Sequence, residues 1–424
     1  MTMTSTIRLS LLLSLFFVLC GCTGPGGYTY KAWDFENQQT AQAQSQPTDV
    51  SATRVVSPQT KPVVSAAAIT TPPIKVALLL PLSGQHEKLG QSMLQAAQIA
   101  LFDVQHQNFE LIPRDTKGTP DGAREAARSA LGDGAQLILG PLFSGSVRAA
   151  KEVTSHTNVN MIAFSTDWTL ASANSFIMGF VPFDQVERII SYAKTNGLDD
   201  IGVIAPDNAY GRMVLSSAQS VAPQIGVKVS STQKFPASLS GLSAHMKQFT
   251  GYESGTPKPS YKAVLMPVGG NAATTVSGLM SKYGLPPSQV VRLGTGLMDD
   301  SGLMNEPNLF GTKFAAPSPA LRTNFEQRYR STYNSNPPRL ATLAYDATAL
   351  ASILARRSAA SGDVRSMFNS KAIMNPNGFA GIDGIFRFRP NGVAERGLAV
   401  LEFRRGRISI VEDAPKTFQA YQDF

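Results

Sequence analysis

The sequence predicts an α/β fold with two doubly wound parallel sheets, one in each of two lobes. From Ile74 onward, short apolar runs of strand length alternate with amphipathic stretches of helix length. This alternation is typical of βαβ units and a parallel sheet. It begins again near Val186, so a second sheet follows the first along the chain. A chain of 424 residues, 43% of them hydrophobic, is long enough to form two domains with ordinary cores.

The first 21 residues have the features of a secretory signal peptide. Arg8 is the only charged residue before position 31, and a mainly apolar run over residues 9–20 follows it. A membrane-spanning helix needs about 20 apolar residues, and this run is shorter. It ends in Leu19-Cys20-Gly21-Cys22, which resembles the bacterial lipobox. The resemblance implies cleavage before Cys22 and attachment of a lipid such as palmitate to its sulfur.

The residues after the predicted cleavage site indicate a membrane anchor and a tether. Lipoproteins kept in the inner membrane usually carry aspartate after the cysteine, whereas this chain carries Thr23. The resemblance therefore implies the periplasmic face of the outer membrane, although an inner-membrane location stays open. Residues 22–73 are rich in Gln, Ala, Ser, Thr and Pro without helical or strand periodicity, which is typical of a disordered tether. As a flexible coil, this segment would span roughly 40 Å.

The first lobe is expected to contain four strands and three helices. Residues 74–80 form an unbroken run of mainly apolar side chains, as in a parallel strand buried on both faces. The next helix carries Leu94, Ile99 and Val104 among its apolar residues. The strands are expected at residues 74–80, 109–113, 137–139 and 160–164, and the helices at residues 89–107, 121–133 and 146–155.

The second lobe repeats this order of elements. Gly197 is placed to end its first helix, because glycine is common just after a helix. The strands are expected at residues 200–205, 227–233, 263–267 and 291–294, and the helices at residues 186–196, 212–222 and 272–283.

Composition disfavours several kinds of partner and cofactor. The net charge is +8, but Lys and Arg are spread along the chain and an exported protein meets little nucleic acid. The charge suits anionic lipid headgroups, an anionic cell-wall polymer or simple solubility. Cys20 leaves with the signal peptide and Cys22 takes the lipid, so no disulfide is expected. The four histidines lack metal-ligand spacing, and we expect neither a metal nor a cofactor.

The loops after the predicted strands are the candidate ligand site, because doubly wound sheets bind ligands beyond the C-terminal ends of their strands. Their hydroxyl side chains and exposed amides suit neutral or anionic polar groups. Helix capping explains these hydroxyl side chains as well as ligand binding does. The loops are residues 83–84, 141–146, 165–167, 207–210, 269–271 and 295–299.

Five segments in this order resemble the type I periplasmic binding proteins, in particular the leucine/isoleucine/valine-binding proteins. They are residues 76–84, 139–144, 162–166, 205–211 and 343–347. The resemblance covers nearly all of the chain after Ile74. It implies two lobes joined by a three-segment hinge, with crossings near residues 179–181, 315–317 and 374–377. The first lobe would comprise residues 74–179 and 316–374, and the second lobe residues 180–315 and 375–424.

The resemblance also implies how a ligand would be held. In amino-acid-binding relatives, first-lobe hydroxyls and amides meet the ligand carboxylate, and a second-lobe aromatic covers the ligand. The matching positions here are Ser144, Ser146, Ser165 and Thr166, with Tyr210 as the aromatic. The strand-end loops add Ser83, Asp207 and Thr295 to the candidate set.

The ammonium group of an amino acid has no evident partner in this chain. Relatives place an acidic residue after a later strand of the second lobe, where this chain reads Leu293-Gly294-Thr295-Gly296-Leu297. Asp299 and Asp300 lie nearby and would replace that residue only if the loop had a different shape. A buried ammonium without a counter-charge costs several kcal/mol. The sequence therefore disfavours a branched-chain amino acid as the ligand.

The sequence supports two alternative functions. The lipobox, the tether and residues 381–388 resemble the penicillin-binding protein activators, which are outer-membrane lipoproteins, and this resemblance implies a cell-wall synthase as the partner. The alternative is the solute-binding receptor of an ABC transporter for amino acids or another small polar ligand.

Enzyme motifs are incomplete. Residues 140–146 have phosphate-loop spacing, but Ser146 stands where lysine is required. Gly294 and Gly296 begin a dinucleotide-binding fingerprint, but Asp299 replaces the third glycine. Asp207 has no nucleophile or histidine beside it, and its simpler role is to cap the helix that follows. We therefore expect no catalytic activity.

Overall fold

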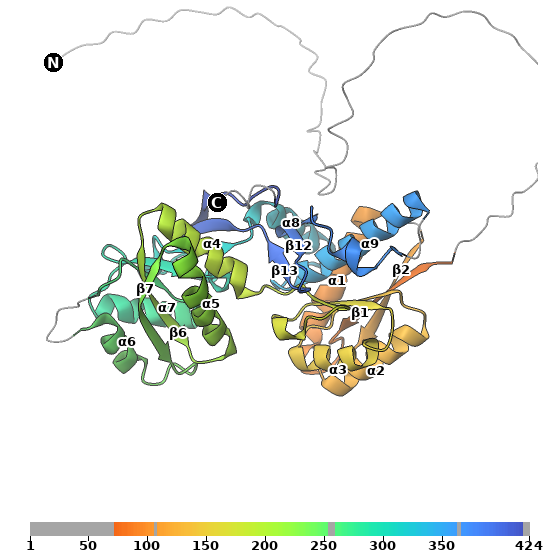
Figure 1. Cartoon of the computed structure of the whole chain (residues 1–424), viewed down its shortest axis with the longest axis horizontal. Coiled ribbons are helices and arrows are strands. Elements are labelled where there is room, and N and C mark those ends of the chain that lie inside the picture. The colour runs from red at the N-terminus through yellow and green to blue at the C-terminus, as the bar shows by residue number, and fades with distance from the viewer. Residues whose placement is uncertain (1–71, 106–107, 253–258, 363–365, 419–424) are drawn as a thin grey trace, which may run out of the picture. The chain divides into compact units, whose positions relative to one another are not determined.

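The computed structural model describes residues 72–105, 108–252, 259–362 and 366–418 (Figure 1). The predicted signal peptide, Cys22 and nearly all of the predicted tether lie outside these residues. The described chain begins just before the first predicted strand.

The first lobe is built on a five-stranded parallel sheet with the order β2-β1-β3-β4-β5. Val76 of β1 is aligned with Leu111 on one side and Leu137 on the other, so the apolar first strand lies inside the sheet. The four predicted strands are present, and β5 is an additional short strand. The strands are β1 Ile74–Leu80, β2 Phe109–Asp115, β3 Leu137–Leu139, β4 Asn160–Ala163 and β5 Ser175–Ile177.

Helices cover both faces of this sheet (Figure 1). Helices α1 (Glu87–Val104) and α9 (Ala341–Ser361) pack against each other on one face, and α2 (Pro120–Gly132) and α3 (Ser144–Thr154) on the other. Gly90 allows α1 to approach the preceding loop, because a Cβ atom there would lie 2.0 Å from the carbonyl oxygen of Pro81.

The second lobe contains a seven-stranded sheet with the order β15-β14-β10-β9-β8-β6-β7. Strands β6 to β10 are parallel and repeat the strand order of the first sheet, which confirms the predicted α/β class and its parallel sheets. The sequence analysis did not predict the antiparallel pair β14–β15 at one edge. The strands are β6 Asp200–Pro206, β7 Lys228–Phe235, β8 Ala263–Leu265, β9 Val291–Gly294, β10 Lys313–Ala316, β14 Ala399–Arg404 and β15 Arg407–Glu412.

Two core clusters flank the second sheet. Helices α4 (Pro182–Thr195) and α5 (Ala209–Ile225) pack together over one cluster. Helices α6 (Leu242–Thr250) and α7 (Gly270–Lys282) bound the other, in which the rings of Phe314 and Phe403 lie 5.0 Å apart. The predicted helices in this lobe are present, and each begins a few residues earlier than expected.

A third, antiparallel sheet lies between the two lobes (Figure 1). Its strands are β11 Phe379–Gly381, β12 Gly384–Phe388 and β13 Ala394–Arg396. The backbone N–H of Ile177 at the end of β5 donates to Gly392, which joins this sheet to the edge of the first sheet. The sequence analysis assigned these residues to the second lobe. The chain enters the seven-stranded sheet only at β14, so its third passage lies between Arg396 and Ala399 rather than at residues 374–377.

One of the other two passages lies between β5 and α4, and the other follows β10. Helix α8 (Pro319–Tyr333), which follows β10, contacts the first lobe through the hydroxyl of Tyr333 and the side chain of Gln98 at 3.0 Å. The remaining helices are short: α10 Ser370–Ile373 and the 3-10 turns Gly84–His86, Trp168–Leu170, Gly296–Met298, Ser301–Leu303 and Pro307–Leu309.

Candidate ligand-binding cleft

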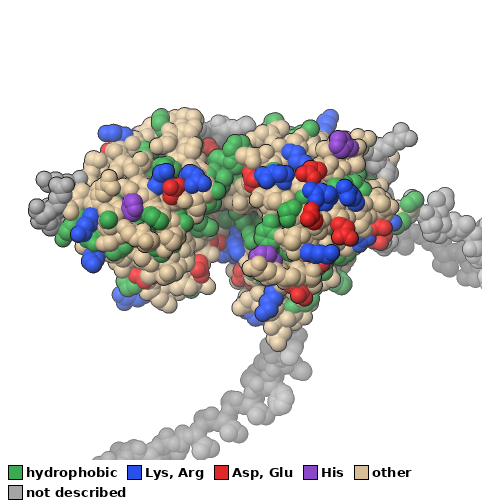
Figure 2. All heavy atoms as spheres, turned by 90° about the horizontal axis from the view of Figure 1, so that it is seen from below, with side chains coloured by type: hydrophobic (Ala, Val, Ile, Leu, Met, Phe, Trp, Pro, Cys, Tyr) green, Lys and Arg blue, Asp and Glu red, His purple; other side chains and the backbone are tan. Residues whose placement is uncertain are grey.

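A cavity of about 1010 Å³ opens at the C-terminal ends of the second-lobe strands and is bounded on its other side by residues of the first lobe. Figure 2 shows one face of the described body, which is hollowed between its two halves. The second lobe supplies most of the lining, much of it apolar. The polar and charged side chains in the lining are Thr166, Gln185, Asn208, Tyr210, Asp299, Asp300, Ser301, Arg322, Glu326 and Arg339.

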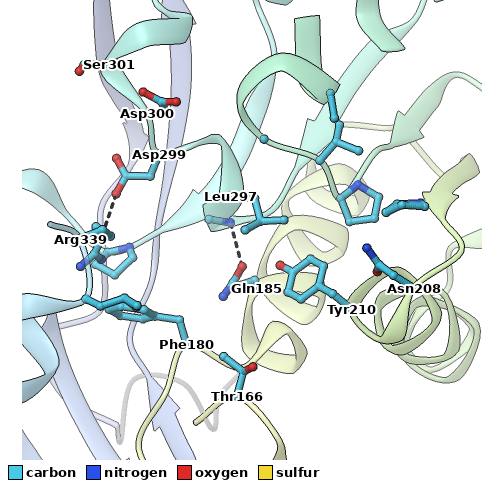
Figure 3. A pocket seen from close by; sticks show the side chains of 18 of the residues that line it. Thr166, Phe180, Gln185, Asn208, Tyr210, Leu297, Asp299, Asp300, Ser301 and Arg339 are labelled. Atoms are coloured by element: carbon cyan, nitrogen blue, oxygen red, sulfur yellow. Dashed lines mark hydrogen bonds and ion pairs between the residues drawn. The ribbon is translucent and has the colours of Figure 1, made fainter. Parts of the chain in front are cut away.

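Tyr210 lies at the base of this cavity, in the first turn of α5 (Figure 3). Its hydroxyl donates to the hydroxyl of Thr295 at 2.9 Å, and Thr295 is fully buried. Burial raises the pKa of Tyr210 to about 12, although the bond to Thr295 acts in the opposite direction. Tyr210 is therefore neutral at physiological pH. Of the eight candidate residues, Thr166 and Tyr210 line the cavity and Thr295 lies directly behind Tyr210.

The four candidate serines of the first lobe lie away from the cavity lining. The hydroxyl of Ser146 donates to the carbonyl of Thr119 at 3.2 Å, and that of Ser165 accepts from the backbone N–H of Asp167 at 3.0 Å. Ser83 donates to the carboxylate of Asp115 at 2.5 Å, and Ser144 is exposed in the first turn of α3. Three of these hydroxyls therefore hold first-lobe loops in place.

Asp115 is the residue around which one of these loops is organised. Burial alone would raise the pKa of its carboxyl, but hydrogen bonds from Ser83, Lys117 and Leu82 outweigh it and leave the pKa below its usual value. The ionised carboxylate thus fixes the loop between β1 and α1.

Asp207 is exposed beside the cavity and is held in ion pairs with Arg212 at 2.9 Å and Lys234 at 3.7 Å. These cations, Arg212 first, lower the pKa of Asp207. The helix cap expected at Asp207 is provided by its neighbour Asn208, whose side-chain oxygen accepts from the backbone N–H of Gly211 at 2.8 Å. The helix therefore begins at Ala209, three residues before the predicted start.

Two arginines from the first lobe bind Asp299, which lies on the loop after β9. Arg322 of α8 forms two hydrogen bonds with its carboxylate, one of them 2.9 Å long. Arg339, in the segment before α9, lies 3.5 Å from the same carboxylate (Figure 3). Only 3% of the Asp299 side chain is exposed. The carboxylate considered from sequence as a substitute ammonium acceptor is therefore already neutralised within the protein.

Asp300 remains exposed at the rim of the cavity. One of its carboxylate oxygens accepts from the backbone N–H of Gly302 at 2.8 Å, which caps the following 3-10 turn. Nothing in the sequence marks Arg322 or Arg339 as partners of Asp299, since they come from other elements far along the chain.

The ring of Phe180, at the passage from the first lobe to the second, contacts two guanidinium groups. Arg339 lies 4.3 Å and Arg396 lies 4.9 Å from the centre of the ring. Arg396 also donates to the carbonyl of Met178 at 2.9 Å. Phe180 lies in the passage between β5 and α4, and Arg396 lies at the passage between β13 and β14. The contact between their side chains therefore links two of the three passages between the lobes.

Two buried carboxyls, Asp346 and Asp383, complete the charged group behind Phe180. Arg339 binds Asp383 at 2.9 Å. Burial raises the pKa of Asp383, but the charges of Arg339 and Arg396 outweigh it and leave that pKa lowered. Burial, reinforced by the charge of Asp383, raises the pKa of Asp346 to about 7. Asp383 is therefore the ionised partner of the arginines.

Comparison with known proteins identifies the family. The model of the periplasmic binding protein family matches residues 73–407. The chain belongs to this family. Its members bind small ligands in the cleft between their two lobes, which is where the cavity lined by Tyr210 lies.

Solved structures share the fold at low sequence identity. A branched-chain amino acid ABC transporter structure from Rhodospirillum rubrum has a TM-score of 0.69 and 17% identity over 80% of this chain and all of that chain. A leucine-binding protein from Thermotoga maritima has a TM-score of 0.58 and 19% identity over 80% and 97% of the two chains. A solute-binding protein from Rhodopseudomonas palustris, solved with 3,4-dihydroxybenzoic acid, has a TM-score of 0.58 and 18% identity over 80% and 96%.

One curated sequence relative is an uncharacterised protein of Rickettsia prowazekii, 22% identical over 160 residues. This match spans 38% of the chain and 43% of the relative. Within the described ranges, no helix is both long and apolar enough to cross a membrane, and no group of three or more potential metal ligands is present.

Proposed function

We propose that this chain is a non-catalytic lipoprotein of the outer membrane that regulates a peptidoglycan synthase of the penicillin-binding protein class. Cys22 carries the lipid, and the tether lets the two-lobed body reach a synthase rooted in the inner membrane. The observation that carries the proposal is the pairing of Asp299 with Arg322 and Arg339.

This pairing argues against transport of an amino acid. A zwitterionic ligand is held best by a carboxylate that meets its ammonium group, and a buried ammonium without one costs several kcal/mol. Asp300, the other carboxylate considered for this role, lies at the exposed rim of the cavity and caps the following turn. Asp299 is engaged, and the hydroxyls of Ser146 and Ser165 hold loops instead of facing the cavity. A receptor that delivers solute to an inner-membrane permease also gains little from an outer-membrane anchor.

The proposal is tested by chemical cross-linking in intact cells that express the full-length lipoprotein. We expect a cross-linked species that contains the lipoprotein and a penicillin-binding protein. A Cys22→Ser variant, which stays unlipidated, should yield less of this species at equal abundance. If no penicillin-binding protein is recovered with the lipidated form, the proposed partner is wrong.

The second candidate function is solute binding, and the size of the cavity favours it. A volume of about 1010 Å³ with Tyr210, Asn208 and Thr166 in its walls is sufficient for a small polar molecule. Native mass spectrometry of the purified protein tests this candidate. An equimolar small molecule, released when the protein is denatured, would support it. A cavity without such a molecule, and no thermal shift across amino acids and short wall peptides, would exclude it.

A further inference from the structure

The two large sheets have four edge strands, and three of them are protected from pairing with other chains. Strand β5 is bonded to residues 392–393 of the chain itself. Strand β2 contains Pro113, which has no N–H to donate, between charged side chains. Strand β7 carries Lys228 and Lys234 with a polar stretch between them. Proline and charged side chains are the usual protection of edge strands.

Strand β15, at the other end of the seven-stranded sheet, is less protected: it has no proline, and its charged residues, Arg407 and Glu412, stand only at its ends. A register shift in its pairing with β14 lies opposite Val400 and Leu401, at the C-terminal end of its apolar centre. It pairs only with β14, and the sequence of its centre is Ile408-Ser409-Ile410-Val411. Ile410 is 41% exposed, one of few large apolar side chains in the described residues with such exposure. Ile408 packs against the adjacent core cluster. Because side chains alternate along a strand, Ile408 and Ile410 share one face of the sheet.

The turn that leads into this strand is positively charged. Arg405 and Arg407 are exposed, and no ion pair joins either of them to another described residue. The acidic residues of the hairpin are already neutralised, since Glu402 is paired with Lys313 at 3.1 Å and Glu412 with Arg188 at 2.7 Å. The free edge therefore combines an apolar row with uncompensated positive charge at one end.

We propose that the outer edge of β15 binds an extended segment of a partner protein by strand addition. Main-chain hydrogen bonds to the unpaired edge would supply affinity. Apolar side chains of the segment would extend the row formed by Ile408 and Ile410, and an acidic side chain would lie beside Arg405 and Arg407. The inference goes beyond the proposed function, because it locates the contact and gives its chemistry whatever the partner is.

Site-specific photo-cross-linking in cells expressing the full lipoprotein tests this surface. A photoreactive amino acid at Ile410 is compared with one at Thr232, an exposed residue of the protected edge strand β7. We expect a product from position 410 whose partner peptide maps to one extended segment with apolar and acidic residues. Equal yields at the two positions, or a product of the chain with itself alone, would overturn the inference.

Affinity for the purified partner domain gives the second readout. Ile410→Lys should weaken binding at least tenfold, whereas Thr232→Lys should change it less than twofold. Arg407→Glu should weaken binding and reduce its dependence on salt. Unchanged affinity of a folded Ile410→Lys protein, with its melting temperature preserved, would contradict strand addition. If the mapped partner is not a penicillin-binding protein, the proposed function fails while the strand-addition site stands.

Discussion

The carboxylate of Asp299 in the second lobe accepts two hydrogen bonds from the guanidinium of Arg322 in the first lobe. Both side chains lie in the wall of the cavity, and 3% of the Asp299 side chain and 14% of the Arg322 side chain are exposed. A charge pair of this kind binds the lobes to each other and removes a charged group from ligand binding.

Arg322→Ala should lower the free energy of unfolding by about 3 kcal/mol, because it leaves a nearly buried carboxylate with only Arg339 as its partner. Urea unfolding measures this change. Glu326→Gln is the matched control, since Glu326 contacts Arg322 at 3.4 Å with 39% of its side chain exposed. Its loss should be about 0.5 kcal/mol. Equal decreases in the free energy of unfolding for the two variants would show that the ion pair with Asp299 stabilises the fold no more than the exposed contact with Glu326 does.

Tyr210→Phe should lower the free energy of unfolding by about 1–2 kcal/mol. The variant removes the donor to the buried hydroxyl of Thr295 and adds no bulk. Thermal or urea unfolding checks this value. If a ligand occupies the cleft, the same variant should also weaken its binding, whereas Ser144→Ala should leave binding unchanged because Ser144 lies outside the cavity lining.

Asp184→Asn should change the dependence of stability on pH. Burial raises the pKa of Asp184 from its ordinary 3.8 to about 7, although Arg389 and the backbone N–H of Arg396 oppose the shift and Glu395 and Glu187 add to it. Between about pH 4 and pH 7, the unfolded chain loses this proton before the folded protein does. The wild-type protein therefore loses stability from this group as the pH rises to about 7, and asparagine removes that loss.

Urea unfolding at pH 4.5, 6 and 8 measures this effect as the difference between the variant and the wild type. The variant should gain on the order of 3–4 kcal/mol relative to the wild type across this range. Asp207→Asn should show almost no change across this range, because Arg212 and Lys234 lower the pKa of Asp207 below 3.8 and its titration therefore lies below about pH 4. If the difference in stability between Asp184→Asn and the wild type does not change with pH, the pKa of Asp184 is not raised in the folded protein.

Phe180→Leu should lower the free energy of unfolding by about 1–3 kcal/mol, because it removes the ring that contacts the guanidinium groups of Arg339 and Arg396 while keeping an apolar side chain. Phe183→Leu is the control, since the ring of Phe183 lies edge-on to Trp168. Urea unfolding should show the larger loss for Phe180→Leu. A larger loss for Phe183→Leu would mean that the guanidinium contacts of Phe180 add no stability.

Hydrophobic periodicity was sufficient to predict the parallel sheets. The run from Ile74 to Leu80 lies inside the first sheet, between β2 and β3, and six of its seven residues are buried. Strand β9 has the predicted bounds. The antiparallel strands β11 to β15 lack this signal, because they are short and several carry charged residues that find partners only in the fold. Glu395, for example, is paired with Arg387 at 2.8 Å.

The charged contacts of the cleft were beyond sequence analysis for a similar reason. Arg322 and Arg339 reach Asp299 only because the chain crosses between the lobes, and no local pattern encodes that approach. Of the hydroxyl side chains expected in strand-end loops, Ser83 and Ser165 lie in loops, whereas Ser144 and Ser146 lie at the start of helix α3. Whether such a hydroxyl faces a ligand or the backbone depends on rotations that the sequence pattern does not specify, as the bond from Ser146 to Thr119 illustrates.

The proposed regulation is tested most directly by the rate of glycan-strand polymerisation by a purified penicillin-binding protein from the same cell, measured with and without the full-length protein. If the proposal is right, the protein changes this rate severalfold and the effect saturates at an equimolar ratio. An unchanged rate at a saturating concentration of the full-length protein, with both proteins folded, would contradict the proposed regulation.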